Sequence, residues 1–319
     1  MFLRALVANP VLAGVTATAL LIIPLGAVLL APLQLVAPLP LLLVALRQGM
    51  KAGFQALAFP VAGALFLSGE MHFPAMVILL FGAFPLLAAW MLRNGWRMSQ
   101  CGSVAFFISL LLLAGGLLLA FLSGFDPSES ARTAMEAARG QFLKDGAEQG
   151  MDAVALMELR TGLDQIVEIL ARLFPALFTT GWFLVQVGNL ALARSLLGRW
   201  GEDWLTPELP QGIRLPFFLI WPFIGSGLLA LTASGSLGNL GVNLVFFLVI
   251  PYFFQGLAVV LTAFRLYGVS GFVRGVFYAA LILWGELFLL VMIVGLFDTW
   301  MDFRKRLPKP EEDDGISKE

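Results

Sequence analysis

The chain has 319 residues, of which 59% are hydrophobic and only 13% are charged, and its formal net charge is −1. Because soluble globular domains carry about 25% charged residues, this composition excludes an ordinary soluble domain and indicates a bilayer protein. No basic block suits nucleic acid, and the single cysteine, Cys101, excludes an intramolecular disulfide.

Long apolar runs separated by short charged segments predict the fold class. Each run approaches the ~20 residues that cross the hydrocarbon, and backbone groups without water must be satisfied inside a helix. We therefore predict an all-α protein, a polytopic transmembrane bundle of eight or nine spans with one extramembrane helical hairpin. The expected spans lie near residues 8–31, 52–69, 74–92, 99–123, 173–194, 215–234, 241–264 and 273–297. A shorter piece at 33–46 is a short span or a re-entrant segment.

Four segments follow from this pattern. Residues 1–125 form the N-terminal transmembrane helices, and 126–172 form an extramembrane amphipathic helical insertion. Residues 173–306 form the C-terminal transmembrane helices with their charged exit, and 307–319 form an acidic tail expected to be disordered. The first apolar run is too long for a signal-peptide core, so we expect it to remain as a helix.

The insertion at 126–172 begins with a helix-start pattern. Asp126 is suited to the N-cap, Pro127 to the first turn, and Glu129 follows three residues after the cap. Nine acidic residues outnumber five basic ones, so the segment is not a polybasic lipid-binding arm. Two roles stay open: a hairpin that caps the bundle, and a gate or partner-docking element.

Charged loop residues set the orientation, because cytoplasmic loops carry an excess of Lys and Arg. The basic residues of alternate loops, which we assign to the cytoplasm, are Arg47 and Lys51, Arg93 and Arg97, Arg194, Arg199 and Arg214, and Arg265 and Arg274. The opposite loops, around 69–73 and 235–240, have none. Counting onward places Arg304, Lys305 and Arg306 outside, against the same rule, although this basic end itself favours a cytoplasmic C-terminus.

Glu286 is the one charged residue well inside an apolar run. It lies 12 residues from both Arg274 and Asp298, which is about 18 Å along a helix and close to the middle of a bilayer. Intramembrane acids usually face a bundle interior or a cavity. Glu286 therefore marks either a ligand-binding or proton-linked site, or a carboxyl group hydrogen-bonded to a neighbouring helix.

Four amides inside the apolar runs are candidate partners of Glu286. Gln186 and Asn189 lie three residues apart on one helix face, and Asn243 and Gln255 lie in the next-to-last predicted span. We expect Gln186, Asn189 and Asn243 to line a binding site with Glu286. The alternative is that these amides form hydrogen bonds that join neighbouring helices.

The end of the last helix gathers aromatic, acidic and basic residues. Asp302 and Arg306 are four apart in the favourable order for a helical ion pair, and Asp298 shares their face. Trp300 is typical of an interfacial aromatic belt. With Arg304, these residues predict either an anchor that fixes the depth of the helix or a docking point for a partner.

Signatures of catalysis and metal binding are missing from the sequence. There is no phosphate-binding Gly-rich loop and no paired-His motif, and one His with one Cys cannot build a His/Cys zinc site. We therefore expect no enzymatic activity, no catalytic residues, no metal and no cofactor. A lipid-acting membrane enzyme is the least favoured hypothesis.

The segment from Gly295 to Lys305 resembles the C-terminal signature of the YybS-like family of uncharacterised bacterial membrane proteins. The segments 39–49 and 255–259 are also similar to that family. Its layout is similar to that of the substrate-binding membrane subunits of energy-coupling-factor vitamin transporters. The resemblance implies a helical small-molecule-binding fold in the bacterial cytoplasmic (inner) membrane. The additional C-terminal spans and the 126–172 insertion depart from the six-helix layout, so no vitamin-specific residue is carried over.

Two functions remain to be weighed. The first is a small-molecule-binding or transport-related membrane subunit, whose partners would be the lipid bilayer and a small ligand. The second is a non-catalytic scaffold that assembles with a membrane or cytoplasmic protein through 126–172 or the 298–306 exit.

Overall fold

The computed structural model describes residues 7–26, 28–201 and 215–306. Those residues are almost entirely helical and contain no strand, which confirms the all-α membrane bundle. The predicted disordered tail, 307–319, lies outside the described residues. The helical segments are α2 (Pro10–Ile22), η1 (Ile23–Gly26), η2 (Val28–Val36), α3 (Pro38–Gln48), α4 (Met50–Ser68), α5 (His72–Val77), η3 (Ile78–Gly82), α6 (Ala83–Arg93), α7 (Met98–Ser123), α8 (Pro127–Glu148), α9 (Ala153–Arg199), η5 (Phe217–Leu219), α10 (Ile220–Thr232), α11 (Gly235–Leu266), α12 (Gly271–Leu283), α13 (Gly285–Met301) and α14 (Phe303–Arg306).

Six helical segments of the described residues are long and apolar enough to cross a membrane. They are Leu29–Gln48, Met50–Ser68, His72–Arg93, Met98–Ser123, Ala153–Arg199 and Gly235–Leu266. A seventh is counted if α12 and α13 form one bent span. The predicted eight or nine spans are reached only when the shorter apolar helices Pro10–Ile22 and Phe217–Thr232 are included.

The N-terminal spans differ from their predicted bounds. A single helix was expected over 8–31, but α2 ends at Ile22 and is followed by 3₁₀ turns with Pro24 and Pro32. Proline lacks the N–H that continues an α-helix, so the chain tightens into 3₁₀ geometry there. The 20-residue candidate span is instead Leu29–Gln48, which contains the piece at 33–46 that the sequence suggested as a short span.

The predicted span 273–297 is broken. Trp284 adopts an extended backbone (φ −119°, ψ 106°), so α12 stops at Leu283 and α13 starts at Gly285. The two helices meet at a bend of 107°. Glu286 therefore lies in the first turn of a new helix and not in the middle of a continuous one.

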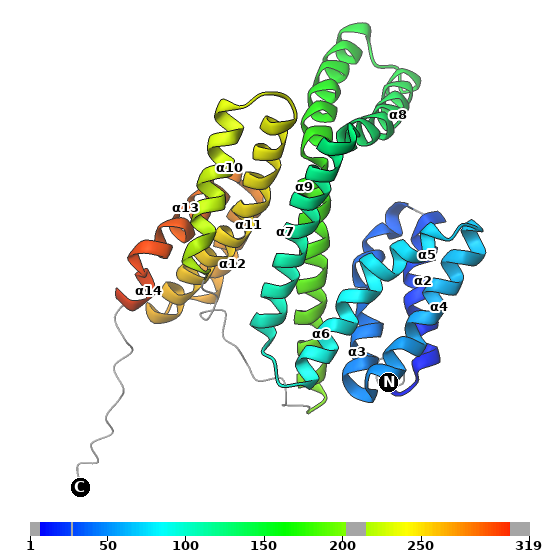
Figure 1. Cartoon of the computed structure of the whole chain (residues 1–319). Coiled ribbons are helices and arrows are strands. Elements are labelled where there is room, and N and C mark those ends of the chain that lie inside the picture. Colours follow the sequence, from blue (N-terminus) through cyan, green and yellow to red (C-terminus); the bar gives the residue numbers. More distant parts are fainter. Residues whose placement is uncertain (1–6, 27, 202–214, 307–319) are drawn as a thin grey trace. The chain divides into compact units, whose positions relative to one another are not determined.

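The chain forms two compact units, whose helices are labelled in Figure 1. The first comprises residues 1–112 and 178–208, and the second comprises 113–177 and 209–319, so α7 and α9 contribute to both. In the first unit α3 is the centre, with an unbroken buried run from Leu41 to Leu46 packed against α4 and α6.

The second unit is built on α11. A tight turn joins α10 to α11, and the two helices pack side by side. Helix α13 packs on α11 as well. The α8–α9 hairpin, which confirms the helix start at Asp126, completes this unit. The Asp126 side chain accepts a hydrogen bond from the Ser128 N–H at 2.8 Å, as an N-cap does.

Candidate functional site

Gln186 satisfies a backbone carbonyl in an irregular turn of the first unit. The turn η3 is a π-helix, whose bonds join each N–H to the carbonyl five residues before it. In that register the Leu80 carbonyl would pair with residue 85, which is proline and has no N–H. The Trp182 Nε1–H (2.8 Å) and the Gln186 Nε2–H (3.0 Å) donate to this carbonyl instead.

Asn189 performs the same task at a second irregular turn. In the 3₁₀ segment η2 each carbonyl pairs three residues onward, as Gln34 does with Ala37. The Leu35 carbonyl would then pair with Pro38, which cannot donate. The Asn189 Nδ2–H donates to Leu35 at 2.7 Å, across the interface between α9 and η2.

Asn243 is inserted at a proline-weakened turn in the second unit. Its Oδ1 accepts from the Ala176 N–H at 3.0 Å and its Nδ2–H donates to the Arg172 carbonyl at 3.0 Å. These two backbone groups are the pair that an ordinary helical bond would join, and Pro175 lies between them. Side chains that enter the ladder in this way accompany helix kinks.

The three predicted amides are therefore buried and bonded to backbone groups of neighbouring segments. Such groups cost about 1–3 kcal/mol each when left unpaired in a site without water. The geometry supports the alternative in which these amides join helices, and it gives each one a specific backbone partner.

Glu286 has a different environment from the amides. Its side chain is exposed in the first turn of α13, where a carboxylate is stabilised by the helix dipole. None of the described residues donates a hydrogen bond to it, and it lines neither of the two cavities described below. Its role as a ligand or proton site stays a prediction.

The charged exit of α13 forms a buried polar network with α11. The Asp298 carboxylate accepts from Arg304 Nη2 at 2.9 Å, from the Phe303 N–H at 2.8 Å and from Gln255 Nε2 at 3.1 Å. The side chains of Arg304 and Asp298 are only 6% and 2% exposed. Gln255 Oε1 in turn accepts from the Leu215 N–H, just before α10, at 3.0 Å.

The predicted pairing at this exit was wrong in one respect. Asp302 and Arg306 do not share a continuous helix, because α13 ends at Met301 and Asp302 takes a left-handed conformation (φ 43°, ψ 58°). That turn folds the chain back, so Arg304 reaches Asp298 and Lys305 reaches Asp302 at 2.7 Å. Trp300 is half exposed and contacts the Phe297 ring; its place in an interfacial belt stays a prediction.

Two glycines bring α11 and α13 into backbone contact beside this network. A Cβ on Gly256 would overlap the Val291 carbonyl, and a Cβ on Gly295 would overlap the Tyr252 carbonyl. Small residues permit this close approach between membrane helices. Two of the three sequence segments that resemble the YybS-like family, 255–259 and 295–305, thus lie against each other.

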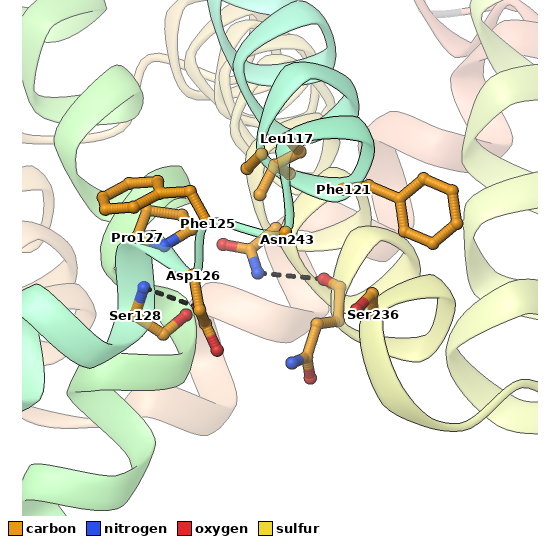
Figure 2. A pocket seen from close by; sticks show the side chains of 11 residues that line it. Leu117, Phe121, Phe125, Asp126, Pro127, Ser128, Ser236 and Asn243 are labelled. Atoms are coloured by element: carbon orange, nitrogen blue, oxygen red, sulfur yellow. Dashed lines mark hydrogen bonds between the residues drawn. The ribbon is translucent and has the colours of Figure 1, made fainter.

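A small polar cavity opens at the other end of the second unit (Figure 2). Its volume is about 120 Å³. Its polar walls come from Asp126 and Ser128 at the start of α8 and from Ser236, Asn239 and Asn243 at the start of α11; its apolar wall comes from the end of α7. Asn239 also accepts from Arg172 Nε at 3.0 Å.

Ion pairs join the two helices of the α8–α9 hairpin, and the hairpin exposes apolar side chains. Arg132 pairs with Glu168 at 2.8 Å and Arg139 with Asp164 at 2.7 Å across the two helices. The buried residues of α8 are only Ala131 and Gly146. A shallow groove of about 500 Å³ lies between the helices, lined by Leu143, Leu156, Met157, Arg160, Thr161 and Asp164.

Within the described residues, no group of three or more His, Cys, Asp or Glu side chains gathers as metal ligands would. No curated protein and no solved structure is significantly similar to the chain. One family model, described as a predicted membrane protein, matches residues 12–299 and so nearly the whole chain. The chain belongs to this family, DUF2232, of predicted membrane proteins.

Proposed function

We propose that the chain is a non-catalytic membrane subunit that docks a protein partner through the α8–α9 hairpin. This proposal rests on the exposure of large apolar side chains on an element that we expect to lie outside the bilayer. Phe142, Val154 and Met157 are 62%, 68% and 73% exposed. Exposed apolar patches of this kind mark interaction sites.

The register between α9 and α11 supports a position of the α8–α9 hairpin outside the bilayer. Arg172 bonds Asn239 and Ala176 bonds Asn243, each with a separation of 67 residues, so the helices run parallel there. Gly235, the first residue of α11, is then level with residue 168. Met157 lies 11 residues before residue 168, which places it about 16 Å beyond the start of α11 along the helix axis. If the start of α11 marks the edge of the hydrocarbon, side chains at that distance lie beyond the lipid tails.

Charge indicates the chemistry of the partner. The hairpin segment has nine acidic and five basic residues, and Arg132 and Arg139 are engaged in the cross-helix pairs. Glu136, Glu148 and Glu158 remain exposed. A protein that presents an apolar ridge flanked by Lys or Arg would match this surface.

A photo-crosslinking residue at Met157, in native membranes, tests this function. We expect one adduct with a second protein, lost when Val154→Glu places a charge on the same face. The same crosslinker at Thr133, an exposed position of α8, is the matched control and should give no adduct. An adduct of twice the 34.6 kDa chain mass, or no adduct, would overturn the docking of a different protein.

The small-molecule-binding subunit remains the second candidate, and the cavity at Asp126 and Asn243 favours it. Sites for drug-sized ligands are about 300–1,000 Å³, so a cavity of about 120 Å³ suits a solute of only a few heavy atoms. The Asp126 carboxylate at its wall suits a small cation.

Methylammonium is a suitable probe for this cavity. The melting temperature of the detergent-solubilised protein should rise with methylammonium, and the rise should vanish in Asp126→Asn, which keeps an N-cap acceptor for Ser128 but removes the charge. Equal shifts in both proteins would eliminate cation binding at this cavity. On either function the location is the bacterial cytoplasmic membrane, and the energy-coupling-factor resemblance bears only on the second candidate.

A further inference from the structure

We propose that α12 and α13 form a re-entrant pair, which enters and leaves the membrane on the side of Arg265 and Arg274. The C-terminal cluster Arg304–Arg306 would then lie on the cytoplasmic side. This inference is independent of the proposed docking function, because it concerns the path of the chain after α11.

The length and the bend of the two helices favour a re-entrant path. Helix α12 has 13 residues and α13 has 17, which is about 20 and 25 Å, so neither alone matches the ~30 Å hydrocarbon thickness. Their bend of 107° exceeds a right angle. At this angle α13 runs mostly across the direction of α12 and slightly back along it, so it does not extend the crossing that α12 begins.

The level at which α13 ends also favours a re-entrant path. Gln255 lies 20 residues beyond Gly235, about 30 Å along α11 and so one hydrocarbon thickness from the α10–α11 turn. Its Oε1 accepts a hydrogen bond from the Leu215 N–H, five residues before α10, and its Nε2 donates to Asp298 near the end of α13. The end of α13 thus shares a level with the end of α10 opposite the turn.

The arrangement of the second unit agrees with that level. Helix α14 lies toward the end of this unit opposite the α10–α11 turn (Figure 1), and it contacts α11. The turn belongs to the loop 235–240, which has no basic residue and is assigned to the outer side. The opposite end is the side assigned to Arg265 and Arg274.

A re-entrant pair removes the conflict in the charge pattern. If α12 and α13 crossed the membrane, Arg304, Lys305 and Arg306 would lie outside, against the excess of basic residues on cytoplasmic sides. If the pair returns, all the basic segments after α11 lie on one side. The buried Asp298–Arg304 pair and the Gly256–Gly295 contact hold the returning helix to α11.

Cysteine accessibility in the full-length protein tests the path. The single Cys101 is replaced by alanine, and cysteines are placed singly at the exposed positions Arg306, Tyr267 and Ser234. A membrane-impermeant maleimide is applied to right-side-out and inside-out vesicles. We expect Arg306→Cys and Tyr267→Cys to react only in inside-out vesicles, and Ser234→Cys only in right-side-out vesicles.

Labelling of Arg306→Cys together with Ser234→Cys would show a full crossing and overturn the proposal. A fourth variant, Trp284→Cys, tests entry into the membrane, since Trp284 is 62% exposed in the protein. It should react with a permeant maleimide but with the impermeant one from neither side. Fast reaction with the impermeant reagent would place the pair on the surface and also overturn it. A tag fused after residue 319 gives the same readout if Arg306→Cys does not fold.

Discussion

Asp298 and Arg304 place opposite charges in a site that is almost closed to solvent, and the Asp298 carboxylate also accepts hydrogen bonds from Gln255 and the Phe303 N–H. Removing charges from water costs several kcal/mol per ion, and the pair recovers this cost only while both members and their hydrogen bonds are present. The network is therefore intolerant of single changes.

Changing one member of this pair should be more harmful than changing both. We expect Asp298→Asn or Arg304→Met to lower the free energy of unfolding by about 3–5 kcal/mol, because each leaves a buried charge alone. The double variant should lose less than the sum of the two. Urea unfolding in detergent, followed by tryptophan fluorescence, measures this coupling. Lys305→Ala, in an exposed pair with Asp302, is the control and should change stability by less than about 1 kcal/mol. Additive losses would refute the coupling.

The contact between α11 and α13 makes a second prediction at single residues. Gly256→Ala and Gly295→Ala should each destabilise the protein by at least ~1–3 kcal/mol, because the new methyl group meets backbone that cannot move aside. Gly275→Ala in α12 is the control, since nothing lies within 4 Å of its Cβ. Thermal unfolding in detergent separates the cases, and equal melting temperatures in all three variants would disprove the close contact.

Among the elements, α9 carries the most specific task. Its side chains donate hydrogen bonds to one carbonyl in each of the irregular turns η2 and η3. In the hydrogen-bond register of its own turn, each of these carbonyls would pair with a proline, which has no N–H. Trp182 and Gln186 donate to the Leu80 carbonyl, and Asn189 donates to the Leu35 carbonyl. Irregular backbone survives at membrane depth only where protein satisfies it. Helix α9 thus stabilises the broken parts of the first unit by hydrogen bonds from its side chains.

Coupling between Gln186 and Pro85 tests this account. Gln186→Leu should cost about 0.5–1.5 kcal/mol, because one hydrogen bond to the Leu80 carbonyl is lost while the bond from Trp182 remains. In a Pro85→Ala background an N–H becomes present at residue 85, and the same change should cost less by at least ~0.5 kcal/mol. Unfolding of the four proteins gives the double-mutant cycle. Gln141→Leu, an exposed change in α8, should be nearly neutral. A cost that is identical in both backgrounds would argue against the role of the proline.

At the scale of the whole molecule, the apolar surface of the candidate spans must face lipid. We expect the chain to stay in the membrane pellet after carbonate at high pH or urea, and to enter solution only with detergent, because the long apolar helices cannot be exposed to water. Immunoblotting of the fractions measures this. Release by carbonate alone would contradict a multi-pass arrangement.

The fold class could be predicted from the sequence because it depends mainly on the length of each apolar run relative to the bilayer thickness, and that length is a local property of the chain. The helix start at Asp126 was equally readable, since a cap depends on neighbouring residues only. The break at Trp284 was not predicted, because an apolar run of the right length looks the same whether it is straight or bent.

The hydrogen-bond partners of the candidate site residues could not be predicted from the sequence. Asn189 and Gln186 were recognised as unusual, but their partners are carbonyls far away in the chain, and backbone partners leave no trace in the residue pattern. The pairing of Asp298 with Arg304 was missed because it needs the left-handed turn at Asp302, a conformation that non-glycine residues adopt only rarely. The prolines at 38, 85 and 175 were the signal that could have linked each amide to its place.

The link between Pro85 and Gln186 has a consequence for how sequences of this family diverge. A lineage that replaces the proline supplies the missing N–H and frees position 186 to become apolar, whereas a lineage that loses the glutamine first passes through a less stable intermediate. Substitutions at the two positions should therefore be correlated across relatives, and the order of the two events should be biased: the proline is expected to change before the glutamine.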